Sequence, residues 1–200
     1  MRADVTDGPC GAAGLALACL LLACLPESVA TQLSWQRDAI LGGQWWRLWT
    51  GHLAHFGMQH AVFDAIVLFA GASLLERELG TRRLLRQLLL VGPLIALGLF
   101  GASGLDEYRG ASGLAAAVAL AAGIALWPGA GRWRPALLVG GVAWLGFSVA
   151  QAVRPEWSAA GLPEDVAVAW QAHLFGAACA LLPGWRAARC SAAGIRQPNT

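Results

Sequence analysis

Four polar side chains interrupt the long apolar stretches of this sequence, and they are His60, Asp64, Ser112 and His173. Ionisable groups in such stretches cost free energy, so each is a candidate for function. A serine hydroxyl becomes a nucleophile when a nearby base accepts its proton, and histidine is the usual base. Ser112 and His173 are therefore a candidate nucleophile and base.

Two glycines, Gly110 and Gly113, flank the serine in the stretch YRGASGL. They let the backbone approach a substrate carbonyl, and free N–H groups at a helix start can stabilise an oxyanion. A structural interpretation is also open, because small residues let membrane helices pack closely. On that interpretation Ser112 is a packing residue, and His173 is a core histidine bonded to a carbonyl.

His60 and Asp64 are four residues apart, which places them on one face of a helix. His60 can donate to an oxyanion while Asp64 orients its ring. The pair can equally satisfy itself, or form part of a proton relay. His55 precedes this pair and is expected to lie nearer the membrane interface, where it stabilises a loop through hydrogen bonds.

Composition identifies the elements that must position these residues. The 200-residue chain is 57% hydrophobic and 13% charged, with a mean hydropathy of +0.55, whereas soluble domains carry roughly 25% charged residues. Blocks of about 20 apolar residues span a bilayer, and they do so as helices. The sequence thus predicts one all-α membrane domain.

The net charge of +2 comes without a dense basic run, which argues against nucleic-acid binding. The histidines and five cysteines lack metal-ligand spacing, so we expect no metal, no cofactor and free thiols.

Six spans are predicted, at about 11–26, 59–76, 84–103, 111–127, 135–153 and 166–183. The first span could instead be a signal peptide cleaved after Ser28-Val29-Ala30, although the acidic N-terminus favours a retained span. Ten arginines fall on the side of the termini and four on the other, so the termini are predicted to be cytoplasmic. The loops 27–58, 104–110 and 154–165 then face outward, which in a bacterium is the periplasm.

The first outward loop carries Trp35, Trp45, Trp46 and Trp49. Tryptophan favours the headgroup region, so we interpret residues 35–57 as a partly helical element in the membrane interface. An ordinary loop with a few aromatic anchors is the alternative.

Three motifs resemble the rhomboid family of intramembrane serine proteases. They are Gly110-Ala111-Ser112-Gly113 for GxSG, Ala172-His173-Leu174-Phe175-Gly176 for AHxxG, and WRLWTGHLAHFGMQHAVFD at residues 46–64. The resemblance covers about residues 40–183. It implies a single rhomboid-like domain over residues 1–200, a six-helix bundle and a cytoplasmic tail at 184–200.

The resemblance also implies roles. Ser112 would be the nucleophile, His173 the general base, and His60 would form the oxyanion hole with the Ser112 N–H. The family's asparagine four residues after that histidine is Asp64 here, and an ionised aspartate cannot donate to an oxyanion. Either Asp64 is protonated, or it only orients His60, or the oxyanion hole relies on other donors. Ala116 replaces an aromatic residue that stacks on the histidine in many bacterial members, so we expect His173 to lack that support. Ala180 replaces a glycine, which should loosen helix packing slightly.

The compact size, the YRG before the serine and the aspartate variant are most similar to the rhombosortase subfamily. That resemblance implies cleavage near a C-terminal Gly-Gly motif of exported proteins that carry one membrane span and a basic tail, by hydrolysis or transfer to an amine. It implies an enzyme of the bacterial inner membrane whose active site opens to the periplasm. Two alternatives are a catalytically inactive rhomboid-like protein that binds membrane segments, and a small transporter with a relay of His60, Asp64 and His173.

Overall fold

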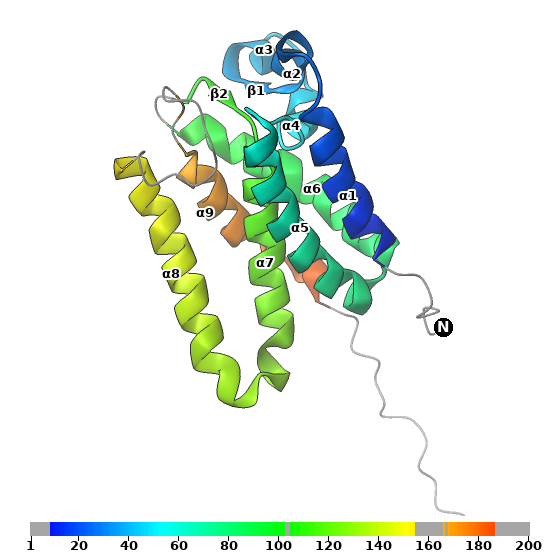
Figure 1. Cartoon of the computed structure of the whole chain (residues 1–200), viewed down its shortest axis with the longest axis vertical. Helices are drawn as coiled ribbons and strands as arrows, with labels where there is room; N and C mark the ends of the chain where they lie inside the picture. Colours follow the sequence, from blue (N-terminus) through cyan, green and yellow to red (C-terminus); the bar gives the residue numbers. More distant parts are fainter. Residues whose placement is uncertain (1–8, 103–104, 155–165, 167, 187–200) are drawn as a thin grey trace, which may run out of the picture.

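The computed structural model describes residues 9–102, 105–154, 166 and 168–186, which form a mostly helical bundle (Figure 1). The principal helices are α1 (Cys10–Leu22), α5 (Met58–Leu79), α6 (Thr81–Gly98), α7 (Ser112–Leu126), α8 (Arg134–Val153) and α9 (Trp170–Cys179). The first loop holds α2 (Glu27–Leu33), β1 (Trp35–Gln36), α3 (Arg37–Leu41) and α4 (Arg47–Thr50), and β2 (Glu107–Tyr108) precedes α7. Short 3-10 turns lie at Leu99–Gly101, Trp127–Gly129, Gly131–Trp133 and Pro183–Trp185.

Within the described residues, four helical stretches are long and apolar enough to cross a membrane. They are Met58–Leu79, Thr81–Gly101, Ser112–Gly129 and Gly131–Gln151, and they overlap the second to fifth predicted spans. The helix α1 is apolar but shorter, with 13 residues, and α9 has 10 residues. The chain is therefore a multi-pass membrane protein, while the count of six spans stays a prediction.

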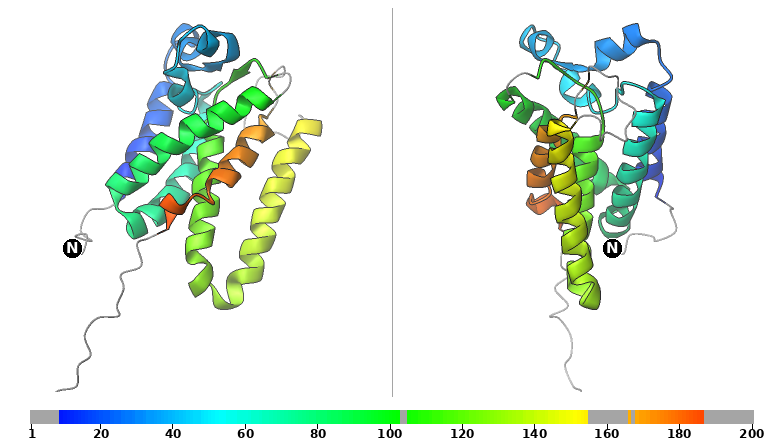
Figure 2. Two further views of the ribbon diagram at one scale, coloured as in Figure 1. Left: turned by 180° about the vertical axis from the view of Figure 1, so that it is seen from behind. Right: turned by 60° about the vertical axis from the view of Figure 1, so that its left-hand side comes forward.

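The helix α5 lies at the centre of the bundle, where it packs against α1 on one side and α7 on the other. The helix α7 packs in turn on α9, and α8 lies at the edge beside α9 (Figure 2). Many of the side chains that α7 buries are alanine: Ala115, Ala116, Ala117, Ala121 and Ala122. Small side chains let membrane helices approach closely, so α7 can contact two neighbours at once.

A buried carboxylate joins the first helix to the end of α5. Glu76 accepts hydrogen bonds from the N–H groups of Gly11 and Ala12, each 2.9 Å long, and Thr81 donates its hydroxyl to the same carboxylate at 2.5 Å. The first N–H groups of a helix lack intrahelical partners. Glu76 therefore caps the start of α1 from a different helix.

The first loop is fastened to α6 by three side-chain donors at successive turns. Trp49 donates its indole N–H to the Leu89 carbonyl at 2.9 Å, a carbonyl left without its intrahelical donor because residue 93, four positions on, is proline. His52 Nε2 lies 2.8 Å from the Gly92 carbonyl, and Trp35 donates to the Ala96 carbonyl at 3.0 Å.

The tryptophans of this loop differ in their surroundings. Trp45, Trp46 and Trp49 are exposed, as an interfacial element requires, but Trp35 is fully buried. Its ring lies edge-on to Phe100, with the centroids 5.1 Å apart. Trp35 is therefore a core residue rather than an interfacial anchor, because its N–H finds a carbonyl partner inside the protein.

Candidate active site

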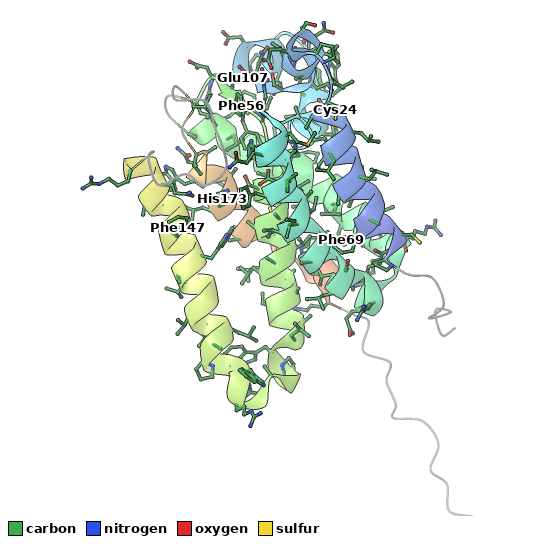
Figure 3. The ribbon with its side chains drawn as sticks, in the orientation of Figure 1. Cys24, Phe56, Phe69, Glu107, Phe147 and His173 are labelled. Atoms are coloured by element: carbon green, nitrogen blue, oxygen red, sulfur yellow. The ribbon has the colours of Figure 1, made fainter. Side chains whose placement is uncertain are left out.

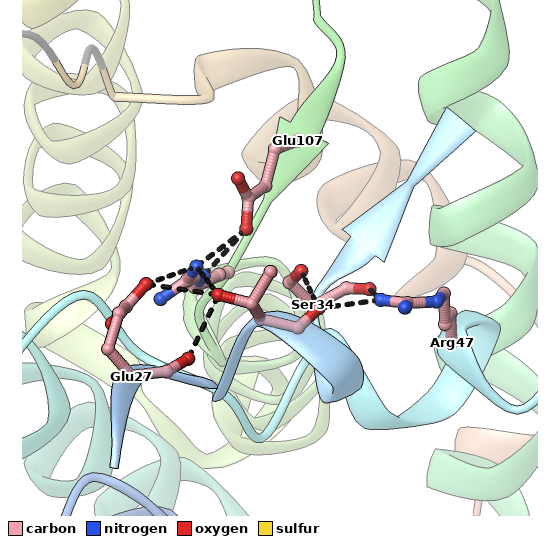
Figure 4. A network of polar contacts seen from close by, with 6 residues as sticks. Glu27, Ser34, Arg47 and Glu107 are labelled. Atoms are coloured by element: carbon pink, nitrogen blue, oxygen red, sulfur yellow. Dashed lines mark hydrogen bonds and ion pairs between the residues drawn. The ribbon is translucent and has the colours of Figure 1, made fainter. Parts of the chain in front are cut away.

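The segment before Ser112 is tied to the first loop by a short sheet and an ionic network. The strands β1 and β2 pair antiparallel, with Trp35 opposite Tyr108. Arg109 is buried, and its guanidinium lies 2.7 Å from Glu27 and 2.8 Å from Glu107 (Figure 4). These carboxylates raise the pKa of Arg109 against the larger, opposite effect of burial. The approach to the serine is thus fixed by partners from α2 and β2.

The turn itself depends on Gly110. Its φ of +138° favours glycine, and a Cβ there would lie 3.0 Å from the His60 ring and 3.1 Å from Asp64 Oδ2. The Gly110 N–H donates to the Gly51 carbonyl at 3.1 Å, and the Tyr108 hydroxyl donates to the Gly110 carbonyl at 2.5 Å. Burial raises the pKa of Tyr108, so its hydroxyl remains a donor. Gly110 therefore brings the backbone against the His60 and Asp64 side chains.

Ser112 is half-buried and is the first residue of α7, with Ala111 as the N-cap. The Ala115 N–H makes the first bond of the helix, to the Ala111 carbonyl at 2.8 Å. The N–H groups of Ser112 and Gly113 precede that bond and lack intrahelical partners. The Gly113 N–H interacts with the Tyr108 hydroxyl, which leaves the Ser112 N–H as the candidate backbone donor to an oxyanion.

The helices that carry Ser112 and His173 meet at glycines (Figure 3 labels His173). A Cβ on Gly113 would lie 3.1 Å from the Ala172 carbonyl oxygen, and a Cβ on Gly176 would overlap the Gly113 carbonyl oxygen. Contact is therefore made at the residue after Ser112 and the residue before His173. Among the hydrogen bonds of the described residues, none joins these two side chains, and His173 Nδ1 is buried without a partner.

An aromatic ring approaches the candidate base from the side of α8. The rings of Trp144 and His173 have centroids 5.4 Å apart at an angle of 37°, and His173 is 6% exposed. The aromatic ring that the resemblance places on α7 is absent, as expected, and a ring from α8 contacts His173 instead. Residue 116 on α7 is alanine and carries no ring. Trp144 on α8 contacts the His173 ring.

His60 and Asp64 share a face of α5, as their spacing predicts, and both are buried. His60 Nε2 lies 3.4 Å from Asp64 Oδ2. The same oxygen lies 3.2 Å from His55 Nε2, and His55 Nε2 also accepts the Ala111 N–H at 3.3 Å. His55 thus belongs to the site as well as to the loop.

Sequence reasoning gave His55 a loop role and gave Trp144 no role. His55 precedes the start of α5, so helical spacing gives no indication that it faces Asp64. Trp144 sits in an apolar span where an aromatic residue is unremarkable. A HxxxxHxxxD pattern was the one available signal for His55. In the part of the chain that the structure describes, no group of three or more His, Cys, Asp or Glu side chains is arranged to hold a metal ion.

Fold and site together define a multi-pass helical membrane protein in which a serine at a helix start adjoins a histidine-bearing helix. Residues 42–190 match the Rhomboid domain family, about three quarters of the sequence, and the chain belongs to that family. The “Putative rhomboid protease YdcA” of Bacillus subtilis (strain 168) is 41% identical over 56 residues. That match covers 24% of this chain and 28% of the relative, so the aligned part spans less than a third of either protein. Membership supports a rhomboid-type intramembrane protease.

Proposed function

We propose that this protein is an intramembrane serine endopeptidase in which Ser112 is the nucleophile and His173 the general base. The observation that carries the proposal is the close contact between Gly113 and Gly176. It adjoins the serine on one helix and lies one turn from the histidine on the other. Catalytic hydrogen bonds are often long in free enzymes and shorten when substrate binds, so the lack of a Ser112–His173 hydrogen bond does not argue against the dyad.

In the proposed reaction, the Ser112 Oγ attacks the carbonyl carbon of a substrate peptide bond while His173 takes the hydroxyl proton. The tetrahedral oxyanion is stabilised by the Ser112 N–H and by His60. When the C–N bond breaks, His173 returns the proton to the leaving amine. Water or an amine then attacks the acyl-enzyme, giving hydrolysis or transfer respectively, and releases Ser112.

For the substrate we propose the class implied by the rhombosortase resemblance. These are exported proteins with a C-terminal Gly-Gly motif, one membrane span and a basic tail. A peptide bond within a helix must be unwound before attack, and each glycine weakens a helix by about 1 kcal/mol relative to alanine. A Gly-Gly site therefore favours cleavage at that position.

We also propose that the protein resides in a bacterial inner membrane with cytoplasmic termini. The arginine distribution supports this orientation. The site at the start of α7 then opens toward the periplasm, and a basic substrate tail would lie on the cytoplasmic side.

The test is labelling of the detergent-solubilised protein with a fluorophosphonate probe. We expect labelling of the wild type and its loss in both Ser112→Ala and His173→Ala. The matched control is Ser28→Ala, which removes an exposed serine of α2 and should leave labelling unchanged. Co-expression with a Gly-Gly-tailed substrate and with its Ala-Ala counterpart then tests the substrate class.

Failure to label a folded wild-type protein would contradict the dyad. Binding of the tailed substrate without cleavage would then favour the inactive rhomboid-like protein. Substrate flux into vesicles that survives Ser112→Ala would favour the transporter.

A further inference from the structure

A cavity lies at the turn between α5 and α6, at the opposite end of α5 from His60 and Asp64 (Figure 1). Its volume is about 440 Å³. The residues that line it are Leu79, Gly80, Thr81, Arg82, Arg83 and Arg86. Three of these are arginines, and a guanidinium binds phosphate or carboxylate through paired hydrogen bonds. The lining therefore suits an anionic ligand.

The arginines of this cavity have no carboxylate partner among the described residues. Arg83 donates to the carbonyl oxygens of Gly184 and Arg186, at 3.2 and 2.5 Å. These acceptors are neutral, so they orient the guanidinium without cancelling its charge. Arg82 and Arg86 are exposed and lie four residues apart on one face of α6, where like charges repel.

The two carboxylates near the end of α5 do not balance these charges. Glu76 accepts hydrogen bonds from the start of α1 and from Thr81, so its oxygens are already engaged. Glu78 is exposed and forms no ion pair within the described part of the chain. The three guanidinium groups of the cavity are thus left without a counter-charge from the residues that the structure describes.

The start of α6 adds backbone donors and an unfavourable charge pattern. The first helical bond runs from the Leu84 N–H to the Gly80 carbonyl at 3.1 Å. The three N–H groups before it, those of residues 81–83, lack intrahelical partners. No described side chain caps this end, and its first turn holds no acidic residue. A helix N-terminus favours anions and disfavours cations, so a bound anion would relieve both this conflict and the repulsion between the arginines.

An apolar stripe continues from the arginines along α6. Leu90, Leu94 and Leu97 are between 40% and 52% exposed. They follow Arg86 at intervals of four, four and three residues, which places them on the same helical face. The stripe belongs to a stretch long and apolar enough to cross a membrane, so it is available to acyl chains. A ligand that joins a phosphate to acyl chains would contact both parts, which a free phosphate cannot do.

We propose that this cavity binds the phosphate group of an anionic phospholipid, whose acyl chains lie along the leucines of α6. Arg82 and Arg86 supply the charged contacts, and the free N–H groups of α6 supply further donors. With the orientation proposed above, the cavity opens at the cytoplasmic leaflet. Lipid binding here does not depend on the proposed proteolysis, because the cavity and the candidate active site lie at opposite ends of the bundle.

The test is the Tm of the detergent-solubilised full chain as lipid is added, because a ligand that binds only the folded state raises Tm. Phosphatidylglycerol should raise the Tm of the wild type more than phosphatidylcholine, which has a phosphate but no net charge. In Arg82→Gln/Arg86→Gln, the phosphatidylglycerol concentration that gives half of the maximal shift should rise at least about tenfold, since one charged hydrogen bond contributes about that factor.

The matched control is Arg132→Gln, which removes an exposed arginine from the turn between α7 and α8. It has the same net charge change at a different site, and it should respond to phosphatidylglycerol as the wild type does. An equal lipid response in the wild type and the double variant would overturn the proposal, because the lipid would then act on the overall charge of the protein. Equal shifts of the wild type with the two lipids would overturn it as well.

Measurements without lipid separate binding from a structural role of the arginines. The double variant should then be at least as stable as the wild type, because the repulsion between Arg82 and Arg86 is lost. A lower Tm of the double variant in detergent alone would show that these side chains have partners within the protein, which contradicts the proposal.

Sodium phosphate distinguishes a lipid from a free anion. At the same concentration and constant ionic strength, it should raise the Tm of the wild type much less than phosphatidylglycerol does, because it makes no contact with the leucines of α6. Equal shifts would show that the cavity binds phosphate itself, and the assignment to a phospholipid would be wrong.

Discussion

The contact between α7 and α9 leads to a prediction for Gly176→Ala. The added methyl group would overlap the Gly113 carbonyl oxygen and lie 3.1 Å from the Ala116 Cβ. Backbone cannot rotate away as a side chain can, so α9 must shift by about 1 Å to restore ordinary contact distances. Overpacking of this kind costs about 1–3 kcal/mol, which exceeds the gain of up to about 1 kcal/mol from replacing a helical glycine by alanine.

The same shift moves His173, three residues away on α9, relative to Ser112. A misplacement of about 1 Å in a catalytic group can cost roughly 100-fold in rate. We therefore expect Gly176→Ala to lower the rate of fluorophosphonate labelling by one to two orders of magnitude, with a modest decrease in Tm. Both quantities can be measured on one detergent preparation.

The matched control is Gly123→Ala on α7. A Cβ at Gly123 would meet nothing within 4 Å, so this variant gains helix propensity without overlap. It should keep the wild-type labelling rate and raise Tm slightly. If Gly176→Ala labelled as fast as the wild type, the helix contact would not set the geometry of the dyad, and the reasoning would fail.

Three further predictions concern the supports of the site. Burial lowers the pKa of His52 to about 4, so as pH falls the unfolded chain takes up a proton before the folded protein does. The free energy of unfolding should therefore be greatest above about pH 6.5 and fall by a few kcal/mol toward pH 4. The Tm of His52→Gln should vary less over that range. Trp49→Phe should cost about 1 kcal/mol in a denaturation experiment, and the cost should shrink when Pro93→Ala supplies the missing helical donor; equal costs in both backgrounds would contradict this. Trp144→Ala should slow labelling by about 2- to 10-fold through loss of its contact with His173, whereas Trp144→Phe should retain most of the rate, and identical rates would show that the ring contact is unimportant.

The sequence predicted those parts of the fold that depend on local pattern. Long apolar blocks fix helices because the bilayer leaves the backbone no other partner, and so the stretches around α5, α6, α7 and α8 were located within a few residues. The pairing of His60 with Asp64 followed from helical spacing. The burial of Trp35 did not, because an indole suits a core and an interface equally well. The contacts of His55 and Trp144 depend on how separate segments pack, and no periodicity within one segment encodes that. Ser112 and His173 were identified as a pair from chemistry and resemblance, and their roles stay predictions.

The cap that Glu76 provides has a consequence for how the chain is made. The amides of Gly11 and Ala12 find their acceptor 64 to 65 residues further along the chain. At synthesis rates of 5–20 residues per second, the start of α1 waits roughly 3–13 seconds for its partner. During that interval α1 has neither its cap nor the surface of α5 against which it packs. Final packing of α1 is therefore a late event in biogenesis, although its sequence leaves the ribosome before that of α5.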